Sequence, residues 1–187
     1  MADASDKRAL LERELAEAAK RAAAQIVEGV EIDAEPKLAL RIAAAWLRIP
    51  AAARAEMKIK RIIHINLKGY ENHWSCPNIK DGLVLGEYEH KAEILWLCRP
   101  AAEWTPSTFY HEAGHALFLA VLDDLVGYYL DGGKRPKHSY GFGSEETIEF
   151  QEEGAEAFRE FMTGVDSFGA RFYEKRYAGG LKDDKEG

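Results

Sequence analysis

The chain has 187 residues, a length that favours one domain with or without an extra arm. Apolar residues make up 47% of the sequence, enough for a buried core, and 32 acidic residues against 25 basic ones give a formal net charge of -7. This acidic balance argues against nucleic acid and anionic membranes as partners, because both are bound by basic surfaces.

An N-terminal helix is predicted over residues 8–27, which are rich in alanine and place leucines near helical spacing. The residues before it lack the apolar core of a signal peptide. We therefore expect a cytoplasmic location, with non-classical export or phage origin as the alternatives. We assign residues 1–34 to a helical arm that could bind a protein partner, and residues 35–178 to the main domain.

The next segment combines helical turns with strands. Pro36 opens a helix that Pro50 ends, and residues 51–57 predict one or two further turns. A small sheet, mixed or antiparallel, is then predicted from β-branched and aromatic residues. Its strands are expected over residues 61–67, 82–88 and 92–97.

Three further helices are predicted in the C-terminal half. Thr105 and Pro106 are typical of an N-cap and a first helical position, and the helix they open extends to between residues 125 and 130. Its longest uncharged stretch is too short to span a bilayer. The other two helices are predicted over residues 145–162 and 168–177. The glycine-rich, charged residues 179–187 predict a disordered tail.

The strongest chemical signal lies inside the first of these three helices. The motif His111-Glu112-Ala113-Gly114-His115 places two imidazoles on one helix face, where both can bind one metal ion. Zinc suits such ligands, and it lowers the pKa of a bound water to about 7. The motif therefore predicts His111 and His115 as zinc ligands and Glu112 as the base that takes a proton from the water.

Such a site needs a third protein ligand. The metzincin pattern is excluded, because Phe118 and Val121 stand where its glycine and histidine would be. The candidates further along the chain are one histidine and a run of glutamates at three- and four-residue steps, and helical periodicity does not choose between the middle two glutamates. These candidates are His138, Glu149, Glu152, Glu153 and Glu156.

Two segments of the chain resemble the anthrax-lethal-factor-like zinc metallopeptidases, a gluzincin group that includes the Pro-Pro endopeptidases. One is the HEAGHA segment that begins at His111, and the other is the EEGAEAFR segment that begins at Glu152. The resemblance covers residues 38–162. It implies that Glu152 is the third zinc ligand and that Glu156 lies next to the ligands. It also implies that Tyr140, in a Ser-Tyr-Gly segment, is a catalytic hydrogen-bond donor.

The resemblance also implies a fold and a reaction. The fold is expected to be α+β and zincin-like, with a small twisted sheet packed on the HExxH helix and a glutamate-bearing helix below it. The reaction is zinc-dependent hydrolysis of peptide bonds in a peptide or protein substrate, with one zinc per chain. In zincins the substrate lies extended along the sheet edge, so residues 92–97 are the expected platform.

Two alternatives to this hypothesis stay open. One is a catalytically inactive zinc-binding module with a regulatory or interaction role, although pure binding has no use for the base Glu112. The other is a protease similar to the SprT-like class, in which His138 would be the third ligand.

The remaining histidines and the two cysteines fit no further site. His64, His73 and His90 are predicted on strands and turns. Cys76 and Cys98 are too few for a disulfide framework and lack the CxxC spacing of a zinc site, so we expect structural thiols.

Overall fold

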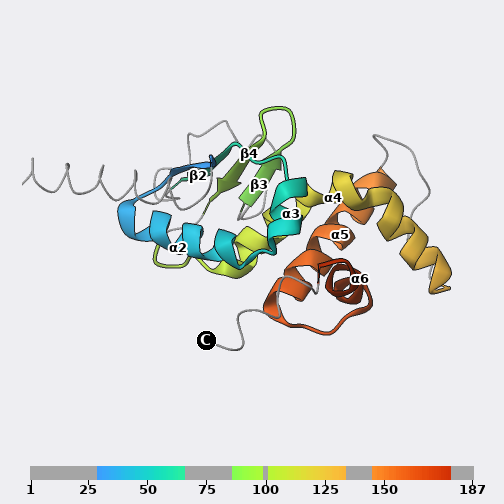
Figure 1. Ribbon diagram of the computed structural model, residues 1–187. Helices are drawn as coiled ribbons and strands as arrows, with labels where there is room; N and C mark the ends of the chain where they lie inside the picture. Colours follow the sequence, from blue (N-terminus) through green and yellow to red (C-terminus); the bar gives the residue numbers. More distant parts are fainter. Residues whose placement is uncertain (1–28, 66–85, 99–100, 134–144, 178–187) are drawn as a thin grey trace, which may run out of the picture.

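The computed structural model describes residues 29–65, 86–98, 101–133 and 145–177 (Figure 1). The predicted N-terminal helix over residues 8–27 and the predicted tail over residues 179–187 lie outside them. In chain order the elements are β1 (Glu31–Asp33), α2 (Pro36–Arg48), α3 (Ala51–Glu56), β2 (Arg61–His64), β3 (Gly86–Glu89), β4 (Ile94–Leu97), α4 (Pro106–Asp131), α5 (Glu145–Thr163) and α6 (Phe168–Tyr177).

The four strands form one mixed sheet in the order β1-β2-β4-β3. β1, β2 and β4 run parallel, with Ile62 of β2 opposite Ile32 of β1 and Leu95 of β4. β3 runs antiparallel to β4, as two strands joined by a tight turn do. The prediction of a small mixed or antiparallel sheet is thus confirmed in its mixed form.

The sheet differs from the prediction in two respects. The sequence does not predict β1, because three residues are too few to show a period of two, and this strand lies in the segment assigned to the arm. The expectation that residues 92–97 form a sheet edge is wrong, because β4 pairs with β2 on one side and with β3 on the other. Among the described strands, the edge that contacts α4 is β3.

Helix α2 packs against β1 and the beginning of α4. Its buried face carries Leu38, Ile42 and Trp46, which recur every four residues as on one side of a helix. Trp46 meets Phe109 of α4 edge to face, with ring centroids 6.5 Å apart. These contacts fix the first turns of α4 relative to the sheet.

Helix α4 begins at Pro106, as predicted, and the extended backbone of Thr105 precedes it. Thr105 is the N-cap residue, as predicted, although its hydroxyl makes no hydrogen bond to the first turn. The helix is 26 residues long and ends before Gly132 and Gly133, the second of which has a φ of 67°. A positive φ is open to glycine without strain, which explains why the helix stops here.

The residues of α4 are unusually apolar for a helix that carries a polar motif. By length and composition alone it could cross a membrane, and 50% of its most apolar window is buried inside the protein. Its contacts with β3, β4, α2 and α5 account for this burial. Figure 1 shows α4 running between the sheet on one side and α5 with α6 on the other. The expected α+β class, with a sheet on the HExxH helix and a glutamate-bearing helix after it, is therefore confirmed.

Helix α6 completes the packing around α5. Its Tyr173 is fully buried, and its last turn reaches back to earlier elements. The hydroxyl of Tyr177 donates to Glu56 of α3 at 2.9 Å, and Arg176 pairs with Glu56 at 3.1 Å and with Asp124 of α4. The C-terminal helix α6 thus contacts α3, which precedes the strand β2, as well as α4 and α5.

Candidate metal centre

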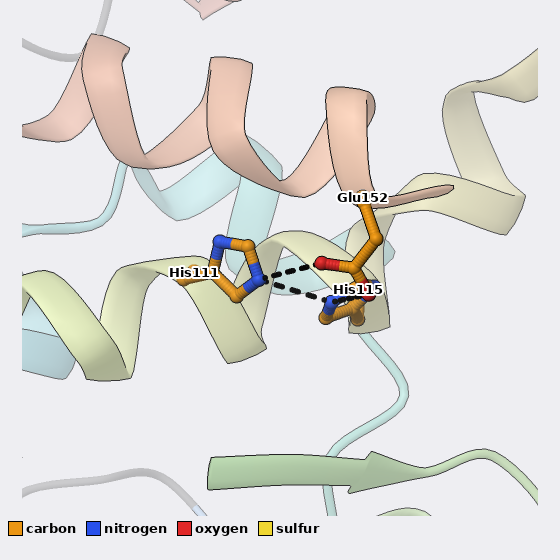
Figure 2. A group of neighbouring side chains, drawn as sticks. All are labelled: His111, His115 and Glu152. Carbon is orange, nitrogen blue, oxygen red and sulfur yellow. Dashed lines mark hydrogen bonds and ion pairs between the residues drawn. The ribbon is translucent and has the colours of Figure 1, made fainter. Parts of the chain in front are cut away.

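His111 and His115 lie one turn apart on α4, each half-buried, with ring centroids 4.9 Å apart. Their Nε2 atoms are 3.3 Å apart. Positions i and i+4 share one face of a helix, and both rings lie on the side that faces α5 (Figure 2). The helix therefore presents two nitrogen ligands to one point in space.

Glu152 joins this pair from α5, which crosses next to the two rings (Figure 2). Its Oε2 atom lies 3.2 Å from Nε2 of His111, and its Oε1 atom lies 3.4 Å from Nε2 of His115. The side chain of Glu152 is 57% exposed, so the group opens to solvent on this side. The fold brings together the three residues that the sequence analysis proposes as ligands, although Glu152 lies 41 positions after His111.

The spacing of these three side chains suits one metal ion. The two Nε2 atoms are 3.3 Å apart, and each lies within 3.4 Å of a different oxygen of the Glu152 carboxylate. With one ligand atom from each residue, all three atoms lie within 4.8 Å of one another. Imidazole nitrogen and carboxylate oxygen are common metal ligands, so the group could hold a metal ion and leave a further position to a ligand from outside these three side chains.

Two glycines allow α5 to approach α4 this closely. Gly114 of α4 lies against the backbone of Ala155, and Gly154 of α5 lies against the ring of Phe118. A β-carbon on Gly154 would stand 2.5 Å from the Cδ2 atom of Phe118, nearer than real β-carbons come to other atoms. Since the distance between packed helices depends on the side chains at their contact, these glycines set the position of Glu152.

Glu112 is the one buried charged side chain among the described residues, with 7% of its surface exposed. It lies against β3, where a β-carbon on Gly86 would come within 2.5 Å of its Cγ atom. Burial is the main reason why the pKa of Glu112 is raised to about 7; the charge of His111 opposes this shift, and Glu152 and Glu87 add to it.

The three ligand candidates also set one another's charge. Burial lowers the pKa of His111, but the hydrogen bond to Glu152 and the surrounding carboxylates outweigh burial, so that this pKa is raised overall. Burial lowers the pKa of His115. The hydrogen bond from His111 lowers the pKa of Glu152. At neutral pH, His115 is therefore neutral and Glu152 ionised, which are the forms that bind a metal.

Glu156 lies at the other nitrogen of the His111 ring. Its Oε2 atom is 3.4 Å from Nδ1, the nitrogen that does not face Glu152. A carboxylate at this place favours the tautomer with the proton on Nδ1, which leaves a lone pair on Nε2 for a metal. The structure thus places Glu156 beside one of the ligand candidates.

The other candidates for the site are distributed differently. Tyr140 and His138 lie outside the described residues, and the side chain of Glu149 is not described either. Glu153 is not part of the group that His111, His115 and Glu152 form, and its carboxylate accepts a hydrogen bond from the hydroxyl of Tyr129. Of the two glutamates that helical periodicity left undecided, Glu152 is therefore the one that joins the histidines.

The residues that we expect to be structural have the expected placement where they are described. His64 lies on β2, and His90 lies in the turn that follows β3. Cys98 is buried directly after β4. His73 and Cys76 lie outside the described residues.

Two residues at this centre are missing from the sequence analysis. Gly86 contacts Glu112 only because β3 is the strand next to α4, and no local pattern announces that placement. Arg159 binds Glu156, with 2.8 Å from its Nε atom to Oε2. This second contact has a sequence signal, since oppositely charged residues three apart on a helix lie within reach of each other.

Comparison of the chain with protein-family models, with curated proteins and with solved structures finds no match. The metal-ligand group therefore rests on its residues and their geometry.

Proposed function

We propose that this protein is a zinc-dependent endopeptidase. The observation that carries the proposal is a group of two imidazoles and a carboxylate whose ligand atoms lie within 4.8 Å of one another, with the buried carboxylate of Glu112 directly after the first histidine. Three protein ligands with an open fourth position are typical of catalytic zinc sites, whereas structural sites use four. The resemblance of the two motifs to the anthrax-lethal-factor-like peptidases supports the same reaction.

When bound at this group, zinc supplies Lewis acidity, which lowers the pKa of a water molecule and polarises a carbonyl group. Glu112 moves the proton in this proposal. It accepts a proton as the water attacks the scissile carbonyl, and it delivers that proton to the leaving amine. Contact with Gly86 limits the movement of the Glu112 side chain, which a general base needs in order to meet its proton in one geometry.

The proposed substrate is an extended peptide or protein segment. β3 is an edge among the described strands, and its first residue, Gly86, contacts Glu112. A segment paired with β3 by main-chain hydrogen bonds would lie beside both the base and the ligands. This strand takes over the role that the sequence analysis gives to residues 92–97.

The family resemblance adds Tyr140 to the proposal as the donor that stabilises the oxyanion. A phenol is suited to this task, because it donates an O–H and is neutral at pH 7. Tyr140→Phe should lower kcat by about 10²–10³-fold, with KM and zinc content little changed. An unchanged kcat would remove Tyr140 from the mechanism and leave the metal site untouched.

The decisive experiment combines metal analysis with a peptide-library cleavage assay on the same sample. The parent should carry close to one zinc per chain and cleave peptides. Glu112→Gln should keep the zinc, since Glu112 is no ligand, and lower kcat by about 10²-fold or more through loss of proton transfer. Glu103→Gln, at an exposed position before α4, is the matched control and should behave as the parent.

Other outcomes point to other functions. A parent that binds zinc and cleaves nothing would indicate a zinc-binding module, and partner binding that is lost on deletion of residues 1–34 would support it. A parent that binds no zinc, or a Glu112→Gln variant as fast as the parent, would contradict the proposal.

A further inference from the structure

Arg159 of α5 connects the metal centre to the beginning of α4. Its Nε atom donates to Oε2 of Glu156 at 2.8 Å, and its Nη2 atom contacts the other oxygen of the same carboxylate. Its Nη1 atom donates to Oγ of Ser107, in the first turn of α4, at 3.2 Å. Two nitrogens of the guanidinium therefore bind the Glu156 carboxylate, and the third donates a hydrogen bond to α4.

The oxygen of Glu156 that accepts from Nε of Arg159 is the one that faces His111. This Oε2 atom lies 3.4 Å from Nδ1 of the imidazole. Without the guanidinium, the carboxylate of Glu156 could rotate about its Cγ–Cδ bond. Nδ1 of His111 would then face either oxygen or none. With the guanidinium, a turn of the Glu156 carboxylate breaks two charge-assisted contacts at once.

We propose that Arg159 is a positioning residue of the metal centre, which holds Glu156 against Nδ1 of His111 and so fixes the tautomer and orientation of that ligand. The inference rests on the metal centre proposed above, but it concerns a residue that the ligand group does not include. Outer partners of a metal-binding histidine act in this way, and their loss typically weakens metal binding by about 10–100-fold.

The simpler interpretation is an ordinary ion pair between residues three apart on one helix, which would not influence a metal. Arg171 of α6 provides a control of this kind, because its Nε and Nη2 atoms donate to the carboxylate of Asp166 at 2.7 and 2.9 Å. This pair has the same two-nitrogen contact, but it is exposed and its partner does not touch the metal centre.

The first test measures zinc affinity by competition with a chelator. Arg159→Met, which keeps the length of the side chain and removes the guanidinium, should weaken zinc binding by about 10–100-fold. Arg159→Lys should recover only part of this loss, because an ammonium cannot grip two oxygens in one plane. Arg171→Met should bind zinc as the parent does.

In a Glu156→Gln background, Arg159→Met should cause little further loss of zinc affinity, because the partner through which Arg159 acts is already changed.

The second test needs no metal, so it also applies if the parent binds no zinc and the proposed function fails. Histidine ¹⁵N chemical shifts at pH 8.5, in chelator, report which nitrogen of neutral His111 carries the proton. Both nitrogens of the metal-free ring face a carboxylate, Nε2 that of Glu152 and Nδ1 that of Glu156, so the readout is the share of the Nδ1–H tautomer. The parent and Arg171→Met should show the same share, and Arg159→Met should show a smaller one. An Nδ1–H tautomer undiminished in Arg159→Met would overturn the proposal, as would zinc affinity within about twofold of the parent.

Discussion

Gly114 of α4 lies so close to Ala155 of α5 that a β-carbon at position 114 would stand 2.7 Å from the Cα atom and 2.9 Å from the carbonyl oxygen of Ala155. Gly114 directly precedes His115 on one helix, and Ala155 follows Glu152 by three residues on the other. Because the obstacle is backbone, α5 cannot yield by turning a side chain. The geometry of the ligand group therefore depends on the absence of one methyl group.

Gly114→Ala should force the two helices apart and so affect folding and metal binding together. We expect a loss of about 1–3 kcal/mol in the free energy of unfolding, as for other overpacked interiors, and weaker zinc binding. Urea unfolding in chelator and zinc competition measure the two effects. Gly127→Ala on the same helix is the control, because a β-carbon there meets nothing within 4 Å. It should stabilise the protein by about 0.5–1 kcal/mol, and equal behaviour of the two variants would show that the close contact has no effect.

Glu152→Ala should remove the third ligand. Zinc affinity should fall by more than the roughly 10–100-fold expected for an outer partner, and the stabilisation of the protein by added zinc should fall with it. His138→Ala should leave the zinc content as it is. If His138→Ala loses the metal and Glu152→Ala keeps it, the protein is closer to the SprT-like class.

Glu112 makes the metal-free protein less stable as pH rises. Its pKa in the folded protein is raised from 4.5 to about 7. The folded state therefore keeps a proton that the unfolded chain releases between these pH values, and stability falls with pH wherever the folded state binds more protons. In chelator, Glu112→Gln should be more stable than the parent by roughly 3 kcal/mol at pH 8. This gain should disappear toward pH 4.5. Urea unfolding at both pH values measures the difference in free energy of unfolding between the variant and the parent, and a difference that is the same at both would contradict the expectation.

Gly86→Ala should displace the base without touching a ligand. The new β-carbon would stand 2.5 Å from Cγ and 2.9 Å from Oε1 of Glu112, so that side chain must move. Under the proposed function, kcat should fall by about 10-fold or more, because a misplaced base transfers protons poorly. Zinc affinity should stay within a few-fold of the parent. A loss of zinc equal to the loss of kcat would mean that the substitution disturbs α4 as a whole.

The helices could be predicted because proline and glycine mark their ends. Pro36 and Pro106 open α2 and α4, and Gly164, with a φ of 76°, follows the end of α5. The strand order of the sheet cannot be predicted in this way, because it depends on pairing between segments that lie far apart in the chain. β1 has three residues, and no local pattern shows that β4 pairs on both sides.

The candidate site divides in the same way. The spacing of His111 and His115 follows from helix geometry alone. The choice of Glu152 over Glu153 does not, because it depends on how α5 crosses α4 at Gly114 and Gly154. The family resemblance points to Glu152, and the crossing supplies the physical reason.

The contact of Tyr177 and Arg176 with Glu56 has a consequence for cooperativity. Tyr177 and Glu56 are 121 positions apart, yet the hydroxyl and the carboxylate are hydrogen-bonded. The last described helix thus contacts one that precedes the sheet strand β2, and Arg176 also pairs with Asp124 of α4. Release of α6 would break these contacts with α3 and α4 and expose the aromatic side chain of Tyr173 in one event. The sheet with α2 and α3, and the helices α4, α5 and α6, should therefore unfold in a single transition rather than in two.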